Sequence, residues 1–129
     1  MKDETAIWLE YAAENLASAQ ILLDSGLFNS CLQNVQQCVE KLLKAVLVEF
    51  YSNLVKTHSI SKLKQILTEK GTDINITNDE CDLLDTIYLP SKYPIGSVIP
   101  EYNPDADICR DCIAIASRVN KSVKDLLRK

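Results

Sequence analysis

Residues 29–53, NSCLQNVQQCVEKLLKAVLVEFYSN, have the clearest periodicity in the chain. Their apolar side chains recur at steps of three and four residues, which is the spacing of one face of an α-helix. We therefore expect a helix over about 29–53, long for a globular protein, that buries this face against other elements. The apolar positions are Leu32, Val35, Val39, Leu42, Val46 and Phe50.

The residues before this stretch show the same spacing. Over about 5–24 the apolar positions again fall three or four residues apart, and Gly26 follows as a residue that can end a helix. The two long helices should pair as an antiparallel hairpin, because each must bury its apolar face. The apolar positions of the first are Trp8, Ala12, Leu16, Ala19 and Leu23.

Two shorter helices are predicted next. Thr57 or Ser59 can cap a helix that Gly71 is placed to end. A capping-box pattern at 77–80, Thr followed three residues later by Glu, opens another helix over about 78–89. The apolar positions of these two helices are Ile60, Leu63, Leu67, Cys81, Leu84 and Tyr88.

All four prolines of the chain lie in LPSKYPIGSVIPEYNP, residues 89–104, which predicts a long ordered loop. Asn103 is then expected to cap a last helix, with Pro104 in its first turn. That helix should pack against the hairpin of the first two. Its apolar positions are Ile108, Cys112, Ile115, Val119, Val123 and Leu126.

Composition agrees with an all-α chain. With 129 residues, 47% hydrophobic and 25% charged residues, and only three glycines, the chain resembles a globular domain with few turns. We predict an all-α, up-and-down helical bundle of about five helices, with the Pro-rich loop before the last one. Residues 1–129 are expected to form a single domain.

Charge and hydropathy exclude some classes of protein. A net charge of -4 argues against non-specific binding along a long duplex, which needs a broad basic surface. No run of about 18 apolar residues predicts a membrane span. The acidic N-terminus MKDETAIWLEYAAEN lacks the apolar core of a signal peptide, so a cytoplasmic location is expected.

The five cysteines are expected to act as packing residues. Their number is odd, so a disulfide framework is not expected in a chain of this kind. Cys109 and Cys112 form one C-x-x-C, but no second pair has the spacing of zinc ligands. No Walker loop or G-x-G-x-x-G occurs. We therefore expect neither a metal nor a cofactor.

Polar residues gather in the middle of residues 29–53. Gln37, Glu40, Lys41 and Lys44 lie at i, i+3, i+4 and i+7 and therefore share one helix face beside the apolar one. Glu40 precedes Lys44 by four residues, the favourable order for a helical ion pair. The face is either a solvated, salt-bridged stripe or the wall of a groove that meets a ligand or partner, and spacing alone does not decide.

Three further side chains are candidates for a binding site. His58, the only histidine, lies near a predicted helix start and is either a general base or a structural residue. Lys92 and Tyr93 lie together in the predicted loop, where a cation beside an aromatic ring can hold a phosphate and stack on a base. They could equally be exposed residues of a rigid loop.

Four segments, in this order, resemble the HEPN family of small all-helical domains, whose name refers to higher eukaryotes and prokaryotes, nucleotide-binding. WLEYAAENLASAQILLDSGLFNSC resembles its first helix, and QQCVEKLLKA is close to its Gln-x-x-x-Glu-Lys-x-x-Lys-Ala pattern. THSISKL resembles its Thr-His segment. YLPSKYP resembles its Tyr…Arg-Tyr-Pro segment, with Lys92 in place of the arginine.

The resemblance implies a helical bundle that often forms homodimers and associates with minimal nucleotidyltransferase proteins, commonly in toxin–antitoxin pairs. Many relatives are metal-independent ribonucleases that use an Arg-x(4–6)-His motif. Here His58 would require an arginine at 51–53, where the chain has Tyr51, Ser52 and Asn53. Lysine supplies charge but not the planar fork that grips phosphate.

Three hypotheses follow. The first is a nucleotide- or RNA-binding module that acts with a nucleotidyltransferase partner. The second is a ribonuclease toxin with a degenerate motif, in which His58 is the base and Lys56 or Lys92 steadies the phosphate. The third is a purely structural helical adaptor. The residues expected nearest a ligand are Gln37, Glu40, Lys41, Lys44, His58, Lys92 and Tyr93.

Overall fold

The computed structural model describes residues 1–92 and 104–128, and the side chains of all of these except 89–92. The described residues form five helices and no strand, as the sequence predicts. No helix among them combines the length and the hydropathy that crossing a bilayer requires. The helices are α1 (Asp3–Asp24), α2 (Phe28–Tyr51), α3 (Ile60–Glu69), α4 (Asn78–Lys92) and α5 (Ala106–Leu127).

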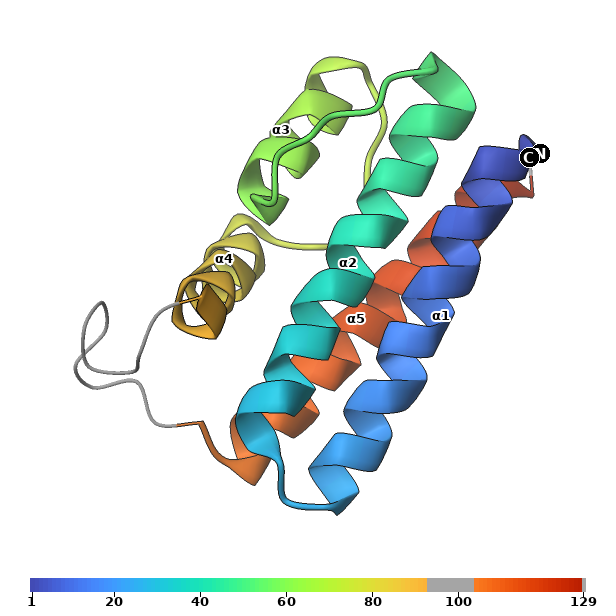
Figure 1. Cartoon of the computed structure of the whole chain (residues 1–129). Coiled ribbons are helices and arrows are strands. Elements are labelled where there is room, and N and C mark those ends of the chain that lie inside the picture. Colours follow the sequence, from blue (N-terminus) through green and yellow to red (C-terminus); the bar gives the residue numbers. More distant parts are fainter. Residues whose placement is uncertain (93–103, 129) are drawn as a thin grey trace.

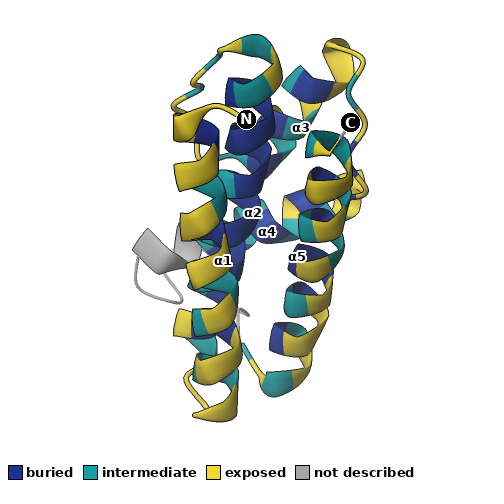
Figure 2. Cartoon of the chain, turned by 90° about the vertical axis from the view of Figure 1, so that its right-hand side faces the viewer, coloured by how far each residue is buried: buried dark blue, intermediate teal, exposed yellow. Residues whose placement is uncertain are grey.

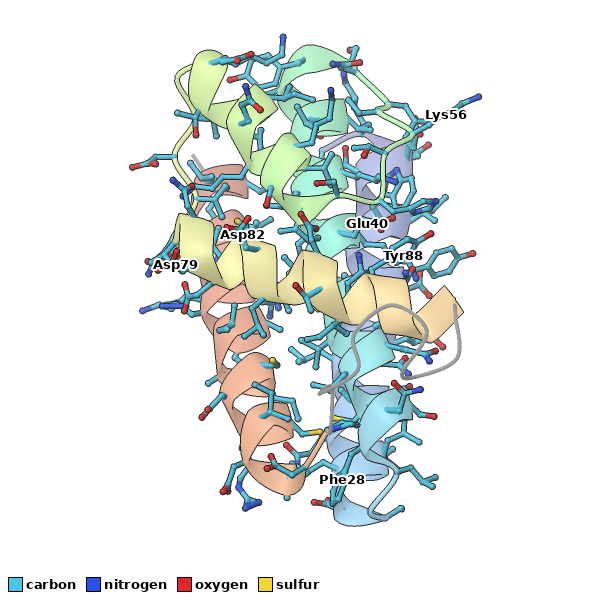
Figure 3. The ribbon with its side chains drawn as sticks, turned by 90° about the vertical axis from the view of Figure 1, so that its left-hand side faces the viewer. Phe28, Glu40, Lys56, Asp79, Asp82 and Tyr88 are labelled. Atoms are coloured by element: carbon cyan, nitrogen blue, oxygen red, sulfur yellow. The ribbon has the colours of Figure 1, made fainter. Side chains whose placement is uncertain are left out.

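The three long helices form the main layer of the bundle (Figure 1). α1 and α2 are antiparallel, and α5 runs parallel to α2, so that it ends at the same end of the bundle at which α1 begins. α3 and α4 contact each other and the other side of α2. α4 lies across the long helices, as the yellow ribbon in Figure 3 shows. The expected hairpin of the first two helices, with the last packed against it, is confirmed.

Helix α2 is the centre of the fold because it contacts each of the other four helices. Residues 42–48 are all buried, and the helix stands out dark blue in Figure 2 between the exposed outer sides of α1 and α5. Of the predicted apolar positions, five are fully buried, but Phe50 is 45% exposed. Its neighbour Tyr51 packs against the core instead and reaches the hydroxyl of Thr72.

The short connections use the residues that the sequence offers. Gly26 (φ 74°) and Gly71 (φ 82°) adopt the left-handed conformation that favours glycine, at the ends of α1 and α3. The capping box is present, because Thr77 and Glu80 each accept the other's backbone N–H. α2 ends at Tyr51, two residues earlier than predicted, with Ser52 in the left-handed conformation.

Two predictions around the Pro-rich segment are wrong. The sequence predicts a loop from residue 89, but α4 continues to Lys92, because one proline near the end of a helix removes only a single backbone hydrogen bond. The residue predicted to cap the last helix, Asn103, lies outside the described residues. The cap is Asp105, whose carboxylate accepts the N–H of Ile108 at 2.9 Å.

Candidate functional site

The middle of α2 buries a row of polar side chains. Gln36, Glu40 and Lys44 follow one another at intervals of four residues, and each is no more than 5% exposed. Burying charged groups is unfavourable unless each one is paired, so every polar atom in this row needs a partner. Of the two alternatives left open for this face, the solvated stripe does not fit Glu40 and Lys44, because both are buried.

Glu40 is the hub of the row. Its Oε2 accepts a hydrogen bond from Lys44 Nζ at 3.0 Å, and its Oε1 accepts one from Gln36 Nε2 at 3.3 Å. The Nδ1 atom of His58 lies 3.2 and 3.3 Å from the two carboxylate oxygens. Gln36 also donates to the backbone carbonyl of His58 at 3.2 Å. One buried carboxylate thus links two turns of α2 to the segment that precedes α3.

His58 is held on three sides but remains open to solvent. Glu40 faces its Nδ1, Gln36 binds its carbonyl, and its ring stacks on that of Tyr88 with centroids 5.1 Å apart and planes 18° apart. Even so, 53% of its side chain is exposed. A carboxylate partner at Nδ1 favours the tautomer with the proton on Nδ1, and this leaves Nε2 able to accept a proton.

A pocket of about 380 Å³ opens beside this histidine, lined by His58, Ser59, Asp85 and Tyr88. Asp85 of α4 caps the start of α3 from outside. Its carboxylate accepts the backbone N–H groups of Ile60 and Ser61, at 2.6 and 3.2 Å, and the hydroxyl of Ser59 at 2.9 Å. These bonds fix the chain directly after His58. Figure 3 labels Glu40 and Tyr88 close together, near the C-terminal part of α4.

The other predicted polar residues of α2 lie on the side of the row that faces α1. Gln37 donates to the Gln36 side chain at 2.9 Å. Lys41 donates to Asn15 of α1 at 2.7 Å, and its ammonium lies 5.8 Å from the centre of the Tyr11 ring. The face predicted from spacing is therefore split between the interior beside His58 and the side of α2 on which Lys41 contacts α1.

Comparison with known proteins identifies the family. The HEPN domain model matches residues 5–126, almost the whole chain. The chain belongs to the HEPN family. None of the curated proteins matches it.

Two solved structures resemble this HEPN chain. The crystal structure of TT1696 from Thermus thermophilus has a TM-score of 0.76 and 23% identity, covering 96% of this chain and 98% of that one. The crystal structure of ST0689, an archaeal HEPN homologue, has a TM-score of 0.72 and 27% identity, covering 98% of each chain. Both agree with the five-helix architecture described above.

The position of the HEPN ribonuclease arginine is occupied by other residues here. At 51–53, Tyr51 donates a hydrogen bond to the carbonyl of Lys70 at 3.3 Å, and Ser52 ends α2. The ammonium of Lys2 donates to Val48 O at 2.9 Å and to the Ser52 hydroxyl, so the N-terminus holds this turn. The turn before His58 is thus built around structural contacts.

The remaining predicted site residues are placed only in part. Lys92 is the last residue of α4, and Tyr93 lies outside the described residues. Lys56 is exposed and extends away from the body of the protein, above Glu40 and Tyr88 in Figure 3. Among the described residues no group of three histidine, cysteine or acidic side chains is placed to hold a metal ion.

Sequence reasoning missed three residues of this site, Gln36, Asp85 and Tyr88. Gln36, Glu40 and Lys44 lie at i, i+4 and i+8, a spacing that places them on one helix face. Gln36 was missed because Glu40 and Lys44 were grouped with Gln37 and Lys41 instead. Tyr88 and Asp85 carry no such signal. They reach His58 and Ser59 from α4, across about 25 to 30 residues of chain, through tertiary packing alone.

Proposed function

We propose that this HEPN chain is a nucleotide- or RNA-binding module that acts with a minimal nucleotidyltransferase protein, as one half of a toxin–antitoxin-type pair. The observation that carries the proposal is the half-exposed His58, fixed against the buried Glu40 and stacked on Tyr88 at the edge of a pocket. A histidine held this firmly while still open to solvent is arranged for a ligand.

The proposed ligand site has a positioning part and a contacting part. Glu40 and Lys44 are buried and neutralise each other, so their role is to orient His58. His58 meets the ligand at the pocket, and Lys41, with Gln37 beside it on α2, meets a part of the ligand that lies nearer α1. Lys92 and Tyr93 follow Tyr88 by four and five residues, and we propose that they complete the site from the end of α4.

The proposals for the partner and for the assembly are based on membership of the HEPN family. HEPN proteins commonly pair with nucleotidyltransferases, and we propose such a partner, a homodimer and a cytoplasmic location for this chain as a single domain. Co-expression with a minimal nucleotidyltransferase encoded beside the gene tests the pairing. We expect the two chains to co-purify, whereas recovery of the HEPN chain alone would contradict it.

RNA binding is tested by anisotropy of a fluorescein-labelled 12-nucleotide single-stranded RNA in buffer with EDTA. We expect wild type to bind and His58→Ala to bind about tenfold or more weakly. Lys121→Ala is the matched control, because Lys121 is exposed on α5, away from the pocket residues. Equal affinity of wild type and His58→Ala would contradict the proposed site.

One observation favours a second function, a metal-independent ribonuclease. The Glu40 contact leaves Nε2 of His58 able to take the proton of a ribose 2′-hydroxyl, whose oxygen can then attack the adjacent phosphorus. The bond from phosphorus to the 5′-oxygen of the next nucleotide breaks, that oxygen leaves with a proton from the histidine or from water, and a 2′,3′-cyclic phosphate remains. Lys56 or Lys92 would have to steady the phosphate in place of the missing arginine. Cleavage of the same RNA in EDTA by wild type, lost in His58→Ala, would establish this function over simple binding.

The purely structural adaptor remains the third hypothesis. It predicts no change of melting temperature with any nucleotide. A ligand present at 100 times its Kd should instead stabilise the protein by about 2.7 kcal/mol.

A further inference from the structure

A second group of aromatic rings and cations lies on the α1 side of α2. Trp8 and Tyr11 are three residues apart and therefore neighbours on the surface of α1. The ammonium of Lys44 lies 5.8 Å from the centre of the Trp8 ring, and that of Lys41 lies 5.8 Å from the centre of the Tyr11 ring. Two rings thus flank two cations on the neighbouring helix.

The two cations differ in what neutralises them. Lys44 is buried and paired with Glu40. Lys41 is only half-buried, and its hydrogen-bond partner is the neutral amide oxygen of Asn15. In the described part of the chain no carboxylate lies within ion-pair distance of Lys41. Its positive charge therefore stands uncompensated beside Tyr11, which is 50% exposed.

This group is linked to the His58 pocket through the interior of the protein. Tyr88 stacks on His58, His58 meets Glu40, Glu40 binds Lys44, and Lys44 lies at the Trp8 ring. The chain of contacts runs from α4 through the buried Glu40 and Lys44 of α2 to α1. α2 lies between α1 and the segment 52–59 in Figure 1. Because packed helices are roughly 8–10 Å apart, a single nucleotide at His58 would not reach Tyr11.

We propose that Trp8, Tyr11 and Lys41 form a second, base-stacking subsite for single-stranded RNA whose other end lies at the His58 pocket. This inference rests on the proposed function and gives its ligand a minimum length. Aromatic rings that hold successive bases, with cations between them for the phosphates, are typical of single-strand binding.

The chain carries its own probe for this subsite, since Trp8 is its only tryptophan. We would titrate the full chain with AMP and with oligo(A) of two, four and eight nucleotides, and follow Trp8 emission. We expect the eight-nucleotide strand to change the emission and AMP to leave it unchanged. Emission that no strand length alters, while anisotropy shows binding, would overturn the subsite.

Variants make the test independent of the probe. Anisotropy with a labelled eight-nucleotide strand should show about tenfold weaker binding for Tyr11→Ala, within the usual range for one stacked base, and near wild-type binding for Tyr11→Phe. Ile21→Ala is the matched control, an exposed apolar residue farther along α1. AMP affinity should be the same in all three variants.

The outcomes separate the two proposals. If His58→Ala weakens binding of the strand and Tyr11→Ala does not, the second subsite is wrong and the proposed function stands. If wild type binds neither AMP nor the strand, both fail. If Tyr11→Ala instead turns a dimer into a monomer in sedimentation, with RNA affinity unchanged, the face belongs to a second copy of the chain and the subsite is overturned.

Discussion

Helix α2 buries two kinds of reactive group, polar side chains and thiols, and the two differ in their access to solvent. In its middle, Gln36, Glu40 and Lys44 form a hydrogen-bonded row that ends at the half-exposed His58. Elsewhere it buries Cys31 and Cys38, and α5 adds the buried pair of its C-x-x-C motif. Both groups include residues that stood out in the sequence, but only the polar row ends at a side chain, His58, that is open to solvent.

The difference shows that the burial and contacts around a motif indicate what its residues do. Burial raises the pKa of Cys38 to about 12, and it does the same for Cys109 and Cys112, so these thiols stay protonated and inert. They behave as small apolar side chains. A buried ion pair is not needed for stability, because well-packed apolar residues in its place often stabilise a protein equally well. We therefore propose that the charges of the polar row serve to hold His58 in place.

The largest expected effect concerns the thiols at high pH. Four cysteines have folded-state pKa values of about 11 or 12, against an ordinary value of 9.0. Between pH 9 and 11 the unfolded chain loses these protons and the folded chain keeps them, so stability falls as pH rises. Each thiol should contribute a loss on the order of 1 kcal/mol per pH unit in this range. Urea denaturation at pH 8 and pH 10 measures the total, on the order of 5 kcal/mol.

The control for the pH effect is a cysteine variant. Cys112→Ala removes one titrating thiol. The free energy of unfolding of this variant should therefore fall less steeply with pH than that of wild type, by the contribution of one thiol. A slope identical to that of wild type would show that Cys112 is not protonated in the folded state as described.

The next effect concerns the polar row. Glu40→Ala leaves the buried ammonium of Lys44 without its partner, and we expect a loss of about 3–5 kcal/mol in the free energy of unfolding, measured with urea. Asp107→Ala is the matched control, because Asp107 is 86% exposed in its pair with Arg110 and should matter by less than about 1 kcal/mol.

A double variant separates stability from function in the same row. Glu40→Leu with Lys44→Met removes both charges, and it should recover most of the stability lost in Glu40→Ala. Since His58 then has no carboxylate, RNA affinity should stay low. A double variant that regains full affinity would mean that Glu40 does not position His58.

The smallest effect concerns the capping of α3. Asp85→Ala removes three hydrogen bonds at the edge of the pocket, and we expect a loss of about 2 kcal/mol. Asp105→Ala removes the single cap bond of α5, far along the chain, and should lose about 1 kcal/mol. Equal losses in urea denaturation would contradict the special role given to Asp85.

The fold was largely predictable from residues 29–53 and their neighbours. The apolar spacing of α2, the glycines at 26 and 71 and the capping box at 77–80 are local signals, and each corresponds to an observed element. The errors lie at 89–105, where the first proline predicts too early an end for α4 and the cap of α5 falls on a different residue. Helix ends depend on single hydrogen bonds, which spacing does not reveal.

The candidate site was predictable only where it is local. Glu40 and Lys44 on one helix, and a lone His58 near a helix start, could be named from the sequence. The burial of Glu40 and Lys44 could not be predicted, because it depends on the packing of α1, α3 and α4 around α2. The stack of Tyr88 on His58 joins residues about 30 positions apart, and no pattern within a helix encodes it.

NMR of the imidazole nitrogens tests whether Glu40 holds His58 as the group that contacts the ligand. His58 is the only histidine, so the imidazole nitrogen signals in an NMR spectrum of the untagged protein belong to it alone. We predict the Nδ1-protonated tautomer in the free protein, lost in Glu40→Ala, and a shift of the Nε2 signal when single-stranded RNA is added. A ring that samples both tautomers equally, with signals that RNA does not move, would contradict the account.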